Sequence, residues 1–135
     1  MTNKPNQLLI QRLRGYLNDK SDYEKLDILF NEYGFDVDFI NQIFPNLIKT
    51  FDDLKFKPHP NQWMGNKAVQ ATLDFGNGHW VSVVGGANGL YGDGINTFEL
   101  GYPVSKNDMD VMGYLSPEEL TKEIFKIQIK KPFTE

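Results

Sequence analysis

The chain has 135 residues and is long enough to bury a core of its own, since 40% of the residues are hydrophobic and 13% aromatic. Its net charge of -4 argues against a protein that binds mainly to nucleic-acid phosphates or to an anionic membrane surface. The absence of cysteine excludes disulfides, thiol nucleophiles and thiolate metal sites. The N-terminal residues lack the apolar run of a signal peptide or a membrane span, so we expect a soluble, cytoplasmic protein.

Apolar residues at helical spacing predict three helical segments within the first fifty residues. The first covers about residues 7–17. The second begins after Ser21, which together with Glu24 forms the pattern of a capping box. The third covers residues 38–43 and is interrupted by Phe44-Pro45, where we expect either a kink or a second short helix that starts at Pro45.

Alternation of apolar and polar residues then predicts strands, the first at 54–57. The stretch 69–84 predicts a β-hairpin and is the strongest structural signal in the chain. Asn77 and Gly78 are typical of a type I′ turn, in which both residues have positive φ. The second strand of the hairpin, 80–84, is apolar on both faces, so we expect it at the centre of its sheet.

The remainder of the chain predicts a long loop, two strands and a closing helix. Five glycines within residues 85–94 rule out regular structure there. Strands are expected at 97–102 and near 111–115. Ser116 begins a second capping-box pattern, followed by an apolar helical face. The tail from Lys130 is expected to be loose.

This order of elements predicts an α+β fold, with an antiparallel β-sheet built on the central hairpin, packed by the C-terminal helix and preceded by a helical N-terminal extension. We expect a helical subdomain at residues 1–51 and the sheet with the last helix at 52–135. About fifty residues form a marginal independent domain, so the two parts are expected to pack as one compact unit.

Residues 54–125 also carry a recurring local pattern. It consists of Phe56-Lys57-Pro58-His59-Pro60, Gln70-Ala71, Phe75, Asn77-Gly78, Ser82-Val83-Val84, Tyr91-Gly92, Phe98-Glu99 and Gly113-Tyr114-Leu115. The pattern resembles a group of small, mostly uncharacterised proteins encoded by bacteriophages and prophages. The resemblance implies a phage accessory protein of similar fold, working in the cytoplasm of the bacterial host, and it supplies no catalytic residues.

Three patterns suggest a ligand or metal site, and each departs from the motif it imitates. The glycine-rich loop has no phosphate-binding register and leads into a strand rather than a helix. Asp108 to Glu119 follows the spacing of a calcium loop, but Met112 stands where an oxygen ligand is needed. His59 and His79 are the only histidines and have no informative spacing, so we expect His59 to be a loop residue and His79 a half-exposed strand residue. We expect no cofactor, no metal and no enzymatic activity.

The main electrostatic feature is an acidic segment at residues 21–38. It contains six carboxylates and one lysine, namely Asp22, Glu24, Asp27, Glu32, Asp36, Asp38 and Lys25. The simpler interpretation is a solvated outer face of two helices. The functional interpretation is a face that meets a basic partner or imitates the charge of nucleic acid, and both interpretations stay open.

Together with the resemblance, these observations favour a non-enzymatic phage or prophage accessory protein that binds a host protein or a protein–nucleic acid complex. One such role is that of an anti-CRISPR-like or anti-restriction-like inhibitor of a host defence nuclease. Direct binding to nucleic acid and binding to membranes are not expected. The candidate binding residues are Asp22, Asp27, Glu32, His79, Trp80, Leu90 and Tyr91. The alternative is a protein that sequesters a nucleotide-like signal with Trp80, Tyr91 and the glycine-rich loop. That loop is longer than a hairpin needs, which predicts a recognition element attached to a stable sheet.

Overall fold

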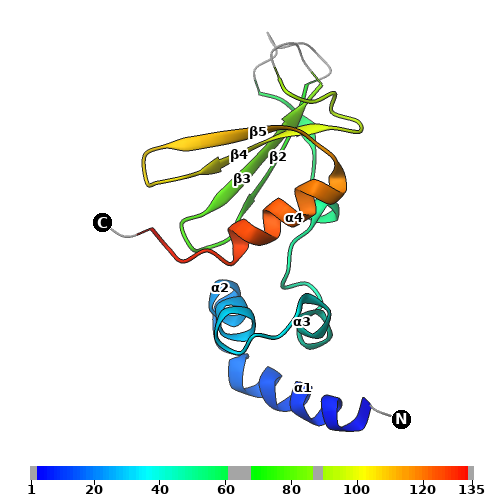
Figure 1. The fold of residues 1–135 in the computed structure, drawn as a ribbon, viewed down its shortest axis with the longest axis vertical. Coiled ribbons are helices and arrows are strands. Elements are labelled where there is room, and N and C mark those ends of the chain that lie inside the picture. Colours follow the sequence, from blue (N-terminus) through cyan, green and yellow to red (C-terminus); the bar gives the residue numbers. More distant parts are fainter. Residues whose placement is uncertain (1–2, 61–67, 87–89, 134–135) are drawn as a thin grey trace. The chain divides into compact units, whose positions relative to one another are not determined.

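The computed structural model of the protein describes residues 3–60, 68–86 and 90–133 (Figure 1). It shows the expected α+β fold, with helices, a five-stranded antiparallel sheet and a C-terminal helix. The chain divides into two compact units, Met1–Ile48 and Lys49–Glu135. Within the described ranges, no helix combines the length and the apolar composition needed to cross a bilayer.

The N-terminal unit is helical. It contains α1 (Asn3–Leu17), α2 (Asp22–Leu26), a π-helical continuation of α2 (Asp27–Glu32) and α3 (Val37–Ile43). The predicted capping box at Ser21 is present, and it ties the first free N–H groups of α2 to side-chain oxygens. The start of this helix was therefore encoded locally.

A small apolar core holds these helices together. Its buried members are Ile10, Leu13, Leu17, Leu26, Leu29, Ile40 and Ile43. Arg14 adds a polar link, because its guanidinium donates hydrogen bonds to the carbonyls of Gln42 (2.9 Å) and Ile43 (2.8 Å) at the end of α3. Of the two arrangements expected at Pro45, a second short helix is not formed there: the chain leaves α3 and makes a single turn at residues 45–47, in which the N–H of Leu47 donates to the carbonyl of Phe44 at 3.1 Å.

The second unit contains the sheet. Its strands are β1 (Lys57–Pro58), β2 (Val69–Asp74), β3 (Trp80–Gly85), β4 (Phe98–Pro103) and β5 (Met109–Leu115), and they pair in sequence order. All neighbours are antiparallel. The central hairpin and the central position of its second strand, β3, are confirmed.

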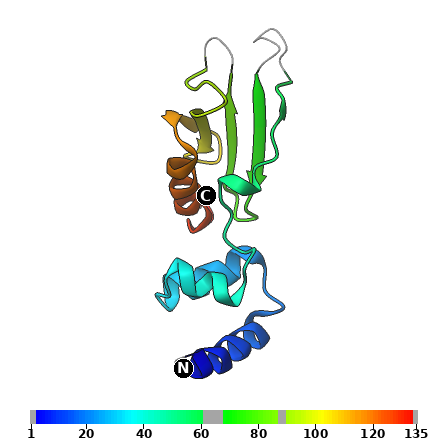
Figure 2. The same cartoon turned by 90° about the vertical axis from the view of Figure 1, so that its right-hand side faces the viewer.

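Helix α4 (Pro117–Gln128) covers one face of this sheet (Figures 1 and 2). The capping box at Ser116 that was predicted for its start is present. The core between α4 and the sheet consists of Leu54, Ala71, Val81, Val83, Phe98, Leu100, Leu120, Ile124 and Ile127. These side chains come from alternate positions of the strands, so the intervening side chains point to the face that α4 does not cover.

The first strand is present, but β1 begins only at Lys57, later than expected, so residues 54–56 lie outside the sheet. Phe51–Asp53 forms a short 3-10 helix, and the N–H of Phe51 donates to Thr121 Oγ1 at 3.0 Å, which fixes this segment on α4. The apolar alternation has another cause, because Leu54 is buried in the core and Phe56 stacks on Phe98. Only Lys57–Pro58 pairs with the sheet, at its edge, where proline is tolerated.

The turn of the central hairpin also differs from the prediction. Positive φ occurs at Gly76 (75°) and Gly78 (84°) but not at Asn77, so the type I′ turn is wrong. A five-residue loop replaces it, with the N–H of Phe75 bonded to the carbonyl of His79 at 3.1 Å. Asn77 is drawn inward instead, because its side chain is 3% exposed and bonds to the C-terminal tail.

The positive φ of Gly78 gives a prediction about stability. We expect Gly78→Val to lower the free energy of unfolding by about 1 to 2 kcal/mol, the cost of holding a residue with a Cβ atom in the left-handed region. The nearest atom to the new Cβ would be a Phe133 ring carbon at 4.0 Å, so backbone strain is the main cause. Urea denaturation measures the loss. Gly78→Asn is the control and should cost less, because asparagine tolerates this region; equal stabilities of Gly78→Val and wild type would contradict the turn geometry.

Candidate functional site

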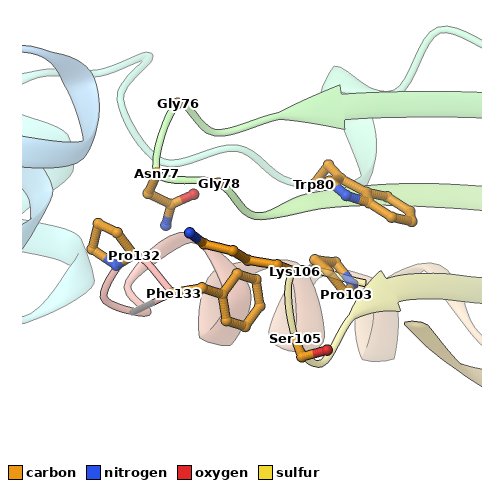
Figure 3. Close-up of a pocket in the computed structure, with 9 residues that line it drawn as sticks. All are labelled: Gly76, Asn77, Gly78, Trp80, Pro103, Ser105, Lys106, Pro132 and Phe133. Atoms are coloured by element: carbon orange, nitrogen blue, oxygen red, sulfur yellow. The ribbon is translucent and has the colours of Figure 1, made fainter. Parts of the chain in front are cut away.

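Two neighbouring pockets share Trp80. The first, here named the sheet-face pocket, has a volume of about 480 Å³ and is lined by Gln70, Thr72, Leu73, Asp74, Trp80, Val81, Ser82 and Met109. The second, here named the hairpin–tail pocket, has a volume of about 330 Å³ and is lined by Gly76, Asn77, Gly78, Trp80, Pro103, Ser105, Lys106, Pro132 and Phe133 (Figure 3). Together they are called the Trp80 surface.

The register of the hairpin builds the sheet-face pocket. Asp74 lies opposite Trp80, and Thr72 lies opposite Ser82, so these side chains share the face that α4 leaves uncovered. Met109 of β5 reaches over this face and is 53% exposed. Glycine at position 101 makes room for it, because a Cβ atom there would lie 2.9 Å from the Met109 methyl carbon. The pocket therefore combines an indole, a thioether, a carboxylate and two hydroxyls.

The hairpin–tail pocket lies between the hairpin loop, the β4–β5 connection and the C-terminal tail. Figure 3 shows the Lys106 side chain extending from that connection toward Asn77, with the Phe133 ring beside it. The connection is itself ordered by hydrogen bonds, since the N–H of Asp108 donates to Ser105 Oγ at 3.1 Å and the N–H of Val104 donates to the carbonyl of Asp108 at 2.9 Å. Three separate chain segments thus form one depression.

The C-terminal tail is held against the hairpin, so the loose tail expected from Lys130 is wrong as far as Phe133. Asn77 Nδ2 donates to the carbonyl of Lys130 at 2.9 Å, and His79 Nε2 lies 2.9 Å from the carbonyl of Lys131. The His79 ring also contacts the Phe133 ring, with 4.1 Å between centroids. We name this set of contacts the tail clamp, and it forms one wall of the hairpin–tail pocket.

His79 is therefore buried, with 2% of its surface exposed, rather than half exposed as expected. A carbonyl oxygen can only accept, so Nε2 carries a proton and donates to Lys131. Nδ1 is then a buried acceptor without a partner among the described residues. Through these contacts His79 has a structural role in the tail clamp. Of the two predicted tip residues, only Trp80 lines the pockets.

Leu90 and Tyr91 line neither pocket. The N–H of Tyr91 donates to Glu99 at 3.1 Å, and its carbonyl accepts from the N–H of Tyr114 at 2.7 Å. The Tyr91 side chain is 51% exposed and lies so close to Gly113 that a Cβ atom there would be 2.4 Å from Tyr91 Cβ. This part of the glycine-rich loop is therefore packed along β5.

Asp93 organises the last part of the same loop. Hydrogen bonds to its carboxylate from the backbone N–H groups of Thr97, Ile95 and Asn96 lower its pKa to about 2. Because the pKa is depressed in the folded state, this interaction stabilises the loop above the ordinary pKa of 3.8 and is lost as the pH falls toward 2. The described loop residues are thus fixed at neutral pH.

The three acidic candidates lie on the helices of the N-terminal unit. The Asp22 side chain is 71% exposed and lies 4.0 Å from the ammonium of Lys25. Asp27 accepts a hydrogen bond from Asn31 at 2.9 Å, and Glu32 is exposed. Two further acids of the segment, Glu24 and Asp36, cap the starts of α2 and α3, so these two carboxylates have a structural role. Asp22 and Glu32 remain the most accessible carboxylates of the three.

The last residue of the calcium-loop spacing between Asp108 and Glu119 also has a structural role. Glu119 accepts the N–H of Ser116 at 2.9 Å in the capping box, and this bond lowers the pKa of the Glu119 carboxyl. Throughout the described ranges, no group of three or more histidine and acidic side chains is arranged to hold a metal ion.

Sequence reasoning missed Met109, Lys106 and the tail as parts of the site. The β4–β5 connection is mostly polar and carries no signal of a site in the sequence, and no local pattern shows that the tail returns to the hairpin. The glycine at position 101 within a strand was the one available signal, because such a glycine often marks the close approach of another group. In comparisons with known proteins, no family model, no curated protein and no solved structure matches this chain.

Proposed function

We propose that this is a non-enzymatic phage or prophage accessory protein that binds a host macromolecule through the Trp80 surface. The observation that carries the proposal is the pair of pockets that share one tryptophan on the sheet face left open by α4. Tryptophan is enriched among the residues that dominate binding energy at protein interfaces, most often where it is surrounded by groups that exclude water.

The surface has the composition of a protein-recognition site. Trp80 and Met109 supply apolar contact, and methionine adapts its shape to different partners. Polar groups lie around them, among them Gln70, Ser82 and Lys106. This arrangement of an apolar centre with a polar rim is typical of protein interfaces.

The support beneath the surface favours binding without large rearrangement. Trp80 is the first residue of β3 and lies opposite Asp74 of β2, and from Ser82 onward β3 also pairs with β4. The tail clamp fixes the adjoining loop through Asn77 and His79. A preorganised surface loses less conformational entropy when a partner binds.

The partner class that the charge distribution favours is a nuclease of a host defence system. Such proteins carry basic surfaces for nucleic acid, and the exposed carboxylates of Asp22 and Glu32 have the complementary charge. The net charge of -4 also suits a basic partner. The acidic helices would then assist association, whereas the Trp80 surface would supply the specific contacts.

Capture from host lysate followed by measurement with the purified partner tests this proposal. Trp80→Ala should weaken binding of the identified partner by about a hundredfold, the loss typical of a central tryptophan. Tyr16→Ala is the control, since Tyr16 is 62% exposed on α1 and should be dispensable. Charge reversal at Asp22, Asp27 and Glu32 should mainly slow association. Failure to capture any host protein, or unchanged binding by Trp80→Ala, would refute the proposal.

A second candidate function is sequestration of a small, nucleotide-like signal. One observation favours it, because the volumes of the two pockets, about 330 and 480 Å³, lie in the range of small-molecule sites. A thermal shift across a panel of nucleotides separates the two functions. A rise in Tm that is lost in Trp80→Ala would support the small-ligand role; no shift with any nucleotide would leave macromolecular binding as the better account.

A further inference from the structure

We propose that the sheet-face pocket receives the guanidinium group of an arginine side chain that the partner presents. This inference rests on the proposed function and specifies the chemistry of its contact. It follows from the set of groups that the hairpin register brings together on the uncovered face of the sheet.

The charge of the pocket comes from one residue. Asp74 is the only charged side chain among the eight lining residues, so an anionic group such as phosphate is repelled and a cation is attracted. Its Oδ1 accepts the N–H of Gly76 at 2.9 Å, which holds the carboxylate at the start of the hairpin loop. Among the described residues nothing bonds to Oδ2, so that oxygen is available to a ligand.

The partner of Asp74 across the strands is Trp80, so an indole and a carboxylate line the same pocket. A cation placed between them gains both the attraction of the indole face and an ion pair. The hydroxyls of Thr72 and Ser82 lie on the same face. Ser82 Oγ already accepts a hydrogen bond from Gln70 Nε2 at 3.0 Å, but a hydroxyl oxygen has two acceptor lone pairs, so it can accept one more N–H.

Arginine satisfies these groups better than lysine. Its planar guanidinium stacks on an aromatic face and still directs N–H groups at a carboxylate and at hydroxyls, whereas an ammonium is a compact, strongly hydrated charge. Met109 adds an apolar wall, 53% exposed, for the aliphatic part of the side chain. Lys106 lines the hairpin–tail pocket and not the sheet-face pocket, where Asp74 is the one charged lining residue.

The test uses the full chain and N-acetyl-L-argininamide as the probe. The indole N–H signal of Trp80, assigned by its loss in Trp80→Phe, is followed by NMR during titration. We expect saturable shifts with the arginine probe and about tenfold weaker binding of N-acetyl-L-citrullinamide, which has the same shape without the charge. Asp74→Asn should weaken the arginine probe to a similar extent while keeping an oxygen for the Gly76 N–H.

Asp52→Asn is the matched control, because Asp52 is an exposed carboxylate of the same unit that does not line the pocket. The inference is overturned if the Trp80 signal does not shift, if the citrulline probe binds equally well, or if Asp74→Asn binds arginine as wild type does. A failed arginine test combined with loss of partner capture in Trp80→Ala would leave the proposed function standing. Retained capture by Trp80→Ala would refute the proposed function itself, whatever the probe shows.

Discussion

Replacing Asn77 with alanine is expected to lower the stability of the sheet unit by about 3 kcal/mol, because buried polar groups would lose their partners. The Asn77 side chain is 3% exposed. Its amide donates to the carbonyls of Lys130 (2.9 Å) and Gln128 (3.4 Å), and its oxygen accepts the N–H of His79 (2.9 Å). Urea denaturation followed by tryptophan fluorescence measures this loss, since both tryptophans belong to the unit Lys49–Glu135.

The same substitution should release the tail. Trypsin cleavage after Lys130 is expected to be faster in Asn77→Ala than in wild type, because the carbonyl of Lys130 loses its hydrogen bond and the local backbone can open. Asn107→Ala is the control, as Asn107 is exposed in the β4–β5 connection. Wild-type stability together with a wild-type cleavage rate in Asn77→Ala would show that the tail is not clamped.

Gly92→Ala is expected to cost about 3 kcal/mol, the upper part of the range for overpacking. A Cβ atom at this position would lie 2.5 Å from Phe98 Cα and 2.7 Å from both Phe98 N and the carbonyl oxygen of Thr97. These are backbone atoms at the start of β4, which cannot move aside as a side chain end can. Asn96→Ala, in the same loop and exposed, should have little effect on the urea midpoint.

This second substitution discriminates between two views of the glycine-rich loop. A recognition element that merely projects from the sheet would tolerate a methyl group at position 92, and the urea midpoint would not change. A loop packed on β4 and β5 would not tolerate it. The hydrogen bonds of Tyr91 and Asp93 favour the packed form for the described residues.

Features encoded by neighbouring residues could be predicted from the sequence. The capping boxes at Ser21 and Ser116 each depend on residues within one helical turn, and both are present. The central hairpin could be predicted because an alternating stretch, 69–75, and an apolar stretch, 80–84, lie on either side of a short glycine-containing loop. The apolar character of β3 on both faces correctly indicated a central strand, because such a strand must be covered on each side.

Features that depend on distant residues could not be predicted. Asn77 and Gly78 favour a type I′ turn locally, but the tail offers Asn77 two carbonyls fifty residues later, and a wider loop that reaches them is formed instead. The apolar alternation at residues 54–57 was interpreted as a strand, whereas Thr121 of α4 holds the preceding residues in a 3-10 turn. In both cases a tertiary contact overrode the local preference.

The candidate site was only partly predictable for the same reason. Trp80 was identified because a large aromatic beside a hairpin turn is a recognisable signal. Its neighbours Met109, Lys106 and Phe133 come from segments that the fold alone brings together. His79 has the same sequence context as Trp80, yet it points to the tail and is buried, which no local pattern distinguishes.

The most direct test of the central claim is amide hydrogen exchange of the protein alone and in complex with its captured host partner. Binding through the Trp80 surface predicts slower exchange in peptides covering residues 74–82 and 103–109, which contain the strand ends and the connection that line the two pockets. Peptides covering residues 90–97 should exchange at the same rate in both samples. Protection confined to residues 22–32 or 90–97, with none in the peptides that contain Trp80 and Met109, would contradict the claim.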